Sequence, residues 1–306
     1  MRILHAGAGE TAARRSGADH ESGVCCPTTG FAVFRLMTSC VQRAFPGSFG
    51  IQDGPIHLWG FYMSATQNVV SKPKSAEMHA GPGFRVRRWF ERPPEDALPR
   101  LARFETPTIS DLMNRLYTMS PLVRNQTDPS LRIIGPACTV KVYPGDNLMV
   151  HKSLDIAQPG DVVVVDTANS GNTAVLGDLI STKARHRGIA GFVVDGFIRD
   201  LPAIQALGNF PVFARGVTPI GPLHRGPGEI NHPVSVGGIV VHPGDIIVGD
   251  LNGVVVVPRG IAEELIGRLE AREAAESNYT AAVARGEFSN DWVDQILSTN
   301  GVSIED

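Results

Sequence analysis

The sequence of 306 residues has little of several features that mark specialised classes of protein. It contains only four cysteines, too few for a disulfide framework, and three of them fall within the first 40 residues. We therefore expect a reducing, cytoplasmic location. Cys25 and Cys26 are adjacent and have no cysteine or histidine partner at zinc spacing, which argues against a metal role for them.

Charge and long apolar runs are also scarce. Charged residues make up 19% of the chain, the formal net charge is −3, and no run of Lys or Arg follows one face, so we expect no nucleic-acid ligand. No apolar stretch reaches the roughly 18 residues that a membrane span needs, so we expect no membrane partner. What is present is 42% hydrophobic residues, the balance of a globular protein with a substantial core.

The first 93 residues differ from the rest. They show little periodicity and are rich in Gly, Ser, Thr and Pro, which predicts a poorly structured, largely disordered N-terminal extension. Met63 opens a polar leader, so a misassigned upstream start would explain residues 1–62. Gly7 and Gly9 resemble a dinucleotide-binding turn, but the third glycine is replaced and no βαβ unit follows. We expect a catalytic domain over 94–290 and a tail over 291–306.

After residue 94 the pattern predicts an α/β domain. Two helices are expected within 95–116, separated by Thr106-Pro107-Thr108, and a long helix is expected over 261–287 with Ile261, Leu265, Ile266 and Leu269 on one face. β-Branched runs predict strands at 131–143, 161–168, 192–196, 232–241 and 245–258. Pro-Gly-Asp occurs at 144–146, 159–161 and 243–245, each time as a turn. Consecutive strands after 211 favour a layered β/β/α arrangement over a regular doubly wound sheet.

The segment 177–200, GDLISTKARHRGIAGFVVDGFIRD, carries most of the candidate chemistry. Its helix is capped either by Asn172 or Thr173, or it begins near Gly177. In the second case the backbone N–H groups of Asp178, Leu179 and Ile180 and the positive helix end form a site for a carboxylate or phosphate. The alternative is that Gly177 only permits close packing.

A buried strand then leads to Arg199 and Asp200. Each has a structural explanation: Asp200 two residues before a proline is a good N-cap, Arg199 suits an exposed salt bridge, and Asp195 suits a turn before Gly196. Ligands of open α/β folds, however, lie at strand C-terminal ends beside helix N-termini, where these groups would meet. Asp200 could then hold a divalent cation, Mg²⁺ or Mn²⁺, with water in the other positions.

Six stretches resemble the RraA-like family, which includes the metal-dependent (class II) 4-hydroxy-4-methyl-2-oxoglutarate aldolases. The resemblance runs from about Pro94 to Arg285 and implies a β/β/α, swivelling-domain-like fold. The stretches are TPTISDLMNR (106–115), IIGPACTVKVYPGDNLMVHKSLDIAQPGDVVVVD (133–166), GDLI (177–180), VDGFIRD (194–200), PVFARGVTP (211–219) and GPGEINHPVSVGGIVVHPGDIIVGDLNGVVVVP (226–258).

The resemblance implies a role for each residue of the segment. Gly177 to Ile180 would bind the pyruvyl carboxylate through backbone amides, Arg199 would contact the keto oxygen, and Asp200 would hold the metal. Asp178 would orient a water of the metal shell that takes the substrate hydroxyl proton. The implied reaction cleaves 4-hydroxy-4-methyl-2-oxoglutarate, or a related 4-hydroxy-2-oxo diacid, to pyruvate and a second oxo acid, with oxaloacetate decarboxylation as a side activity.

The family also assembles as a trimer or a dimer of trimers, and a neighbouring subunit supplies an acidic residue. Glu273 and Glu276 are candidates, although a solvated helix face explains either one. The family resemblance carries a second functional reading, a regulator that binds ribonuclease E without catalysis; retention of Asp178, Arg199 and Asp200 favours the enzyme.

Other chemistries have weaker support. A Schiff-base aldolase needs a desolvated lysine, and Lys141, Lys152 and Lys183 lie in no lysine-centred motif. Methyl transfer lacks a glycine-rich nucleotide loop in the patterned region. Five histidines of the patterned region form no pair at metal spacing, and we expect them to be exposed or structural. They are His151, His186, His224, His232 and His242.

Overall fold

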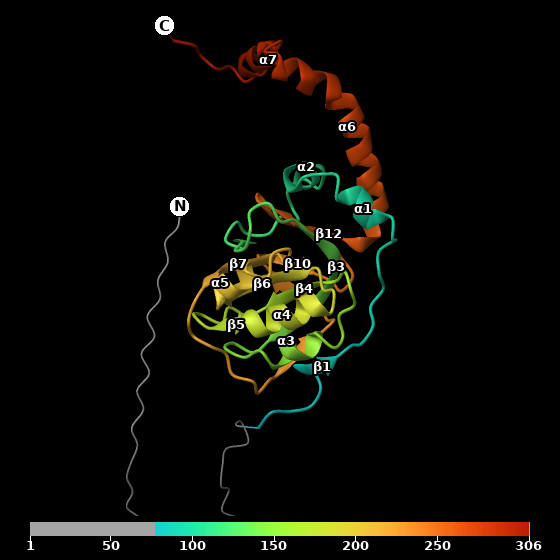
Figure 1. Cartoon of the computed structure of the whole chain (residues 1–306). Helices are drawn as coiled ribbons and strands as arrows, with labels where there is room; N and C mark the ends of the chain where they lie inside the picture. Colours follow the sequence, from blue (N-terminus) through green and yellow to red (C-terminus); the bar gives the residue numbers. More distant parts are fainter. Residues whose placement is uncertain (1–76, 306) are drawn as a thin grey trace, which may run out of the picture. The chain divides into compact units, whose positions relative to one another are not determined.

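The computed structural model describes residues 77–305, which form a mixed α/β domain (Figure 1). The misassigned-start hypothesis and the Gly7–Gly9 turn lie outside the described residues. The strands are β1 (Phe84–Val86), β2 (Arg124–Asn125), β3 (Ile133–Val142), β4 (Val162–Asp166), β5 (Ala174–Leu176), β6 (Gly191–Ile198), β7 (Val212–Val217), β8 (Gly228–Ile230), β9 (Val234–Val236), β10 (Ile239–Val241), β11 (Ile246–Asp250) and β12 (Gly253–Val257). The α-helices are α1 (Ala97–Leu101), α2 (Thr106–Leu112), α3 (Leu148–Ser153), α4 (Asp178–His186), α5 (Leu201–Gln205), α6 (Ala262–Ala284) and α7 (Asp291–Thr299).

The main sheet has the strand order β1-β8-β3-β4-β6-β7-β2. Its centre is parallel, because β3, β4, β6 and β7 pair side by side in the same direction, and β5 adds to β6 in parallel as well. The hairpin β11–β12 branches from the first half of β3, where Ile134 lies opposite Val248. A parallel centre places several strand C-terminal ends at one edge, which is where ligands bind in open α/β sheets.

Alternating valines on β4 separate two apolar cores. Val163 and Val165 face a core shared with α3, α4 and α5, while Val162 and Val164 face a core shared with β9–β12. Successive strand residues point to opposite faces, so a strand buried on both sides reads as a continuous β-branched run. This arrangement confirms the β/β/α layering expected from the sequence.

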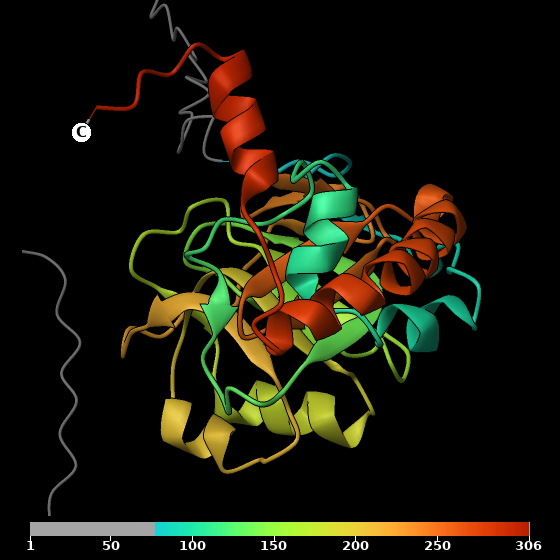
Figure 2. The same cartoon turned by 90° about the horizontal axis from the view of Figure 1, so that it is seen from above.

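A third apolar core lies on the outer face of β11–β12, where α1, α2 and the first turns of α6 pack. In Figure 2 the yellow-green helices lie on one side of the sheets and the teal and red helices on the other. Leu265, Ile266 and Leu269 of α6 are buried as predicted, but Ile261 precedes the helix and is partly exposed. No helix in residues 77–305 is both long and apolar enough to cross a membrane.

Several local predictions need correction. Thr106-Pro107-Thr108 does not separate two helices: it forms the first turn of α2, where proline is tolerated because its missing N–H has no helical partner. The run 232–241 is a hairpin, not one strand, because Gly237 and Gly238 take positive φ between β9 and β10. The three Pro-Gly-Asp turns are confirmed, with positive φ at each of their glycines.

Residues on the N-terminal side of the expected domain boundary at 94 contact the domain. β1 pairs in parallel with β8, and Phe90 is buried in the core beneath α3–α5. Arg92 donates two hydrogen bonds to the buried carboxylate of Asp161, at 2.6 and 2.9 Å. Residues 84–92 are therefore joined to the sheet by pairing, burial and charge.

Candidate functional site

The candidate site begins where β5 and β6 end side by side. The two strands are parallel, and Leu176 lies opposite Ile198, so Gly177 and Arg199 are the next residues at the same sheet edge. The Arg199 backbone N–H donates to the Leu176 carbonyl at 3.0 Å, which ties the two strand ends together. Gly177 and Arg199, which are 22 positions apart in the sequence, thus lie side by side in the structure.

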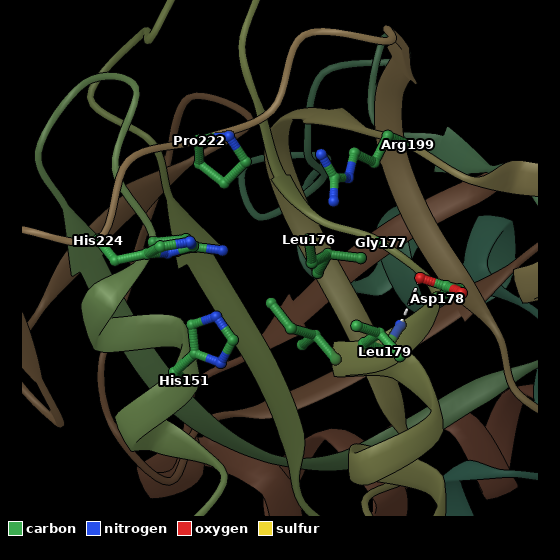
Figure 3. Close-up of a pocket in the computed structure, with 10 residues that line it drawn as sticks. His151, Leu176, Gly177, Asp178, Leu179, Arg199, Pro222 and His224 are labelled. Atoms are coloured by element: carbon green, nitrogen blue, oxygen red, sulfur yellow. Dashed lines mark hydrogen bonds between the residues drawn. The ribbon is translucent and has the colours of Figure 1, made fainter. Parts of the chain in front are cut away.

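The helix α4 begins directly after β5, with Gly177 as its N-cap. The alternative caps Asn172 and Thr173 are wrong, because Ala174–Leu176 is a strand. Since Gly177 has no side chain, nothing on the cap residue covers the first-turn amides. One of these amides is occupied: Leu179 N–H donates to the Asp178 carboxylate at 2.7 Å (Figure 3). A ligand carboxylate that uses this amide must displace Asp178.

Gly177 also leaves room for Arg199 and Asp200. A Cβ at position 177 would lie 2.3 Å from Asp200 Oδ2 and 3.0 Å from Arg199 Cγ. A Cβ at Gly221 would lie 2.5 Å from Arg199 Nη1. The guanidinium therefore passes between the backbones of Gly177 and Gly221. The absence of a side chain at Gly177 makes room for polar side chains, not for apolar packing.

Asp200 holds the N-cap position of α5 but does not act as a side-chain cap. Its backbone is left-handed, with φ 56° and ψ 36°, and no side-chain cap hydrogen bond forms. The carboxylate instead makes an ion pair with Arg199 Nε at 3.2 Å. An aspartate in this conformation costs free energy that ordinary capping does not explain, and such residues concentrate at functional sites.

A pocket of about 190 Å³ lies beside these groups. Pockets for drug-sized ligands measure roughly 300–1,000 Å³, so this smaller volume suits a small organic acid. Its lining includes Gly177, Asp178, Leu179, Ile180 and Arg199, the predicted substrate-binding set. Asp200 is not part of this lining; it reaches the site through its contact with Arg199.

Two histidines also line the pocket, a location that the sequence did not predict, although His224 is exposed as expected. His151 comes from α3 and His224 from the loop before β8, and their ring centroids lie 5.4 Å apart. Burial lowers the pKa of His151, and the charges of His224 and Lys183 lower it further. Nothing in the sequence pairs these histidines, because 73 residues separate them and neither belongs to a spaced motif.

The other predicted residues lie elsewhere. Asp195 is not a turn former: it lies inside β6, pairs with Arg215 and accepts the Gly237 N–H at 2.9 Å. On α6, Glu273 pairs with Arg103 from the segment after α1 at 2.7 Å, and Glu276 pairs with Arg272 of the same helix at 2.9 Å. Neither glutamate lines the pocket within one chain, so a contribution from a neighbouring subunit stays a prediction.

The lysines do not offer a Schiff-base nucleophile at the pocket. Lys141 pairs with Asp166 at 3.5 Å and Lys152 with Asp155 at 3.1 Å, and both are about half exposed. None of Lys141, Lys152 and Lys183 lines the pocket. A covalent amine mechanism needs a desolvated lysine facing the substrate, which this arrangement does not provide.

The carboxylates near the pocket fit a hard divalent cation held largely by water. Asp200 is solvent-accessible and has Arg199 as its ion-pair partner, and Asp178 lies at the start of the adjoining helix. No group of three or more His, Cys, Asp or Glu able to hold a metal occurs within residues 77–305. Mg²⁺ is commonly bound through one or two carboxylates with several waters retained, whereas a zinc site needs a fuller protein ligand set.

Comparisons with known proteins identify relatives of this chain. The family model described as RraA-like, Aldolase/RraA, matches residues 106–256. A protein of Halalkalibacterium halodurans named "Putative 4-hydroxy-4-methyl-2-oxoglutarate aldolase" is 40% identical over 191 residues, covering 62% of this chain and 89% of its own. An uncharacterised protein of Methanocaldococcus jannaschii is 34% identical over 198 residues, covering 64% of this chain and 92% of its own.

Solved structures show the same fold. An uncharacterised protein from Pseudomonas syringae has a TM-score of 0.58 and 28% identity, covering 65% of this chain and 97% of its own. Streptomyces coelicolor RraAS2, described as an unusual member of the RNase ES inhibitor RraA protein family, has a TM-score of 0.57 and 31% identity, covering 62% of this chain and 98% of its own.

Proposed function

Because this chain belongs to the RraA-like family, we propose that it is a divalent-metal-dependent lyase that cleaves a 4-hydroxy-2-oxo diacid to pyruvate and a second oxo acid. The observation that carries the proposal is the meeting of Gly177, Arg199 and Asp200 at one sheet edge. The names of several relatives support an aldolase in general terms. The substrate 4-hydroxy-4-methyl-2-oxoglutarate is our specific proposal.

The pyruvyl end of the substrate would bind at the start of α4. The free amides of the first turn and the positive end of the helix suit its carboxylate. Arg199, fixed between Gly177 and Gly221, would donate to the keto oxygen. Cleavage of the bond between carbons 3 and 4 leaves an electron pair on the pyruvyl fragment, and the fixed guanidinium stabilises the negative charge that develops on that oxygen.

Asp178 would receive the proton of the 4-hydroxyl group through a water molecule, and a proton returned along the same route to carbon 3 of the enolate would give pyruvate. Its carboxylate now accepts the Leu179 N–H, and a bound substrate carboxylate would compete for that amide and free Asp178. Asp200 would hold the cation, Mg²⁺ or Mn²⁺. Such a cation supplies Lewis-acid stabilisation of developing negative charge when bound. Oxaloacetate decarboxylation is a further expected activity, because it also leaves an electron pair on a pyruvyl fragment.

Pyruvate release provides the test. The full chain should release pyruvate from 4-hydroxy-4-methyl-2-oxoglutarate and from oxaloacetate with Mg²⁺, and lose both activities with chelator. Arg199→Ala should lower kcat by about 100-fold or more, since removing one fixed donor to a developing oxyanion costs that much elsewhere. Activity that survives both chelation and Arg199→Ala contradicts the proposal.

A second candidate function is binding to ribonuclease E without catalysis. It is favoured by the structural likeness to the Streptomyces protein, whose description names an inhibitor of RNase ES. The two candidates separate in one assay: an inhibitor that works through binding alone should slow ribonuclease E equally well with or without chelator, and with Arg199→Ala as well as the wild type.

A further inference from the structure

The pocket has a second polar end, formed by His151 and His224, to which the proposed reaction gives no role. Their rings meet edge to face, with an interplanar angle of 73°. In Figure 3 the two rings lie on one side of the pocket and Arg199 and Asp178 on the other, with Leu176 and Gly177 between them. A ligand that occupies the pocket is therefore offered polar groups at both of its ends.

Asn147 determines which nitrogen of His224 carries a hydrogen. Its Nδ2 donates to the Val175 carbonyl at 2.9 Å, and a carbonyl can only accept, so the orientation of the amide is fixed. The remaining oxygen, Oδ1, lies 2.6 Å from His224 Nδ1. Nδ1 must then be the donor, and the other ring nitrogen, Nε2, is left for a further partner.

The turn at 144–146 holds the His224 loop against α3. Asp146 is buried and accepts the backbone N–H of Leu148 at 2.8 Å and that of Arg225. Leu223 N–H donates to the Gly145 carbonyl at 2.8 Å, and Asn147 N–H donates back to Leu223 at 3.0 Å. One Pro-Gly-Asp-Asn segment therefore starts the helix that carries His151 and fixes the loop that carries His224.

The charges around the pair favour an anionic ligand. Lys183 acts on His151 with the same sign as His224, and Asp178, the acidic residue in the pocket lining, lies at the opposite end in Figure 3. Asp146 uses both of its carboxylate oxygens for backbone amides. Because Nδ1 of His224 donates to Asn147, Nε2 can donate to a ligand carboxylate only when the ring carries a second proton. A carboxylate between the rings would stabilise that proton and accept a hydrogen bond from each ring.

We propose that His151 and His224 bind the distal carboxylate of the substrate and so select 4-hydroxy-2-oxo diacids over the corresponding monoacids. This selection of diacids rests on the proposed function, in which the end of the pocket opposite the two histidines binds the 2-oxo acid group. Asn147 acts as a positioning residue, since it touches His224 and holds its ring.

Binding of two stable probes tests the selection without turnover. 2-Oxoglutarate and 2-oxopentanoate have the same chain length and differ in a distal carboxylate or methyl group. By calorimetry with Mg²⁺, the wild type should bind 2-oxoglutarate about 10- to 100-fold more tightly, the worth of a charge-assisted hydrogen bond. His224→Phe and His151→Phe should remove most of that preference by weakening 2-oxoglutarate binding, whereas Arg199→Ala should weaken both probes.

His186→Phe is the matched control, because His186 is an exposed histidine at the end of α4 that does not line the pocket. It should retain the preference. Asn147→Ala should shift the ¹⁵N resonances of His224 toward a mixture of tautomers, which a residue that only fills space would not do. His224→Phe also leaves the buried Asn147 Oδ1 without its hydrogen-bond partner, so its thermal midpoint should fall, and binding is measured below that temperature.

The outcomes separate the two proposals. A wild type that does not prefer 2-oxoglutarate, or a preference that survives both histidine substitutions, overturns the selection even if pyruvate is released. A preference that depends on the histidines, in a protein that releases no pyruvate, supports the carboxylate site and overturns the lyase.

Discussion

Two groups of aspartates in this domain differ in their surroundings: a structural group, which is buried and hydrogen-bonded, and a site group, which stays accessible to solvent. The turn aspartate Asp161 has a fully buried side chain, 0% exposed, and its carboxylate accepts from Arg92 and from the Gln158 N–H. Asp200, which lies beside the pocket, has a side chain that is 39% exposed, with Arg199 as its ion-pair partner at 3.2 Å. The first carboxylate is saturated by the fold, and the second keeps oxygen atoms available to a ligand.

The backbone shows the same difference. In the turn, Gly160 takes the positive φ of 86° and Asp161 follows in ordinary conformation. At the pocket Asp200 itself takes a φ of 56°, although a glycine would adopt it with less strain. The comparison teaches that a carboxylate kept in an unfavourable conformation and left accessible is the one to suspect of chemistry, whereas a buried and bonded one stabilises the fold.

The largest expected effect comes from removing the carboxylate of Asp200. Asp200→Gly should lower kcat/KM for pyruvate release by about 100-fold or more through loss of the proposed cation ligand. The same change should leave the free energy of unfolding unchanged or raise it by up to about 1 kcal/mol, because glycine tolerates the left-handed backbone. Steady-state kinetics and urea unfolding measure the two effects; Asp200→Ala, which cannot relieve the backbone, should lose the activity without gaining stability.

Removing the turn carboxylate should give the reverse result. Asp161→Ala leaves Arg92 without its partner and the Gln158 amide without an acceptor, and we expect a loss of about 3 kcal/mol in the free energy of unfolding. At a temperature where the variant stays folded, kcat should remain close to the wild-type value. If kcat fell as far as in Asp200→Gly, the division into two groups of aspartates would be wrong.

A methyl group at position 177 sharpens the comparison. Gly177→Ala places a Cβ against the Asp200 carboxylate and the Arg199 side chain, and the displacement should lower kcat/KM by about 10- to 100-fold. Gly267→Ala in α6 is the control, because a Cβ there meets nothing within 4 Å. It should leave kcat/KM unchanged and stabilise the helix by up to about 1 kcal/mol. Equal kinetic losses in both variants would contradict a specific role for Gly177.

The smallest expected effect is a pH dependence at Asp250, a buried carboxylate of the structural group. Burial raises its pKa, but hydrogen bonds from Thr106 and Asn252 outweigh burial and hold the pKa below its usual value. A lowered native pKa stabilises the fold above the unfolded-state pKa, and this contribution is lost as pH falls below about 4. Asp250→Asn should flatten the acid side of the unfolding free energy against pH; an unchanged acid slope would contradict this assignment.

The sequence was most informative where local pattern decides structure. The β-branched run at 162–165 predicts a strand buried on both faces, and the positive φ of Gly145, Gly160 and Gly244 is what a Pro-Gly-Asp turn requires. It was least informative where partners lie far apart in the chain. The start of α4 was ambiguous because the capping residues and Gly177 predict equally good helix starts, and only the pairing of β5 with β6 resolves them.

By itself, the sequence determined the α/β class, the long buried strands, the turn chemistry and the motif resemblance that selected Gly177–Ile180, Arg199 and Asp200. These rest on contacts within a few residues or on short motifs. The tertiary structure alone decided that His151 and His224 meet at the far end of the pocket and that Asp195 belongs to an ion pair with Arg215 instead. The reason is physical: sheet pairing and loop anchoring bring together residues whose separation along the chain leaves no periodic trace.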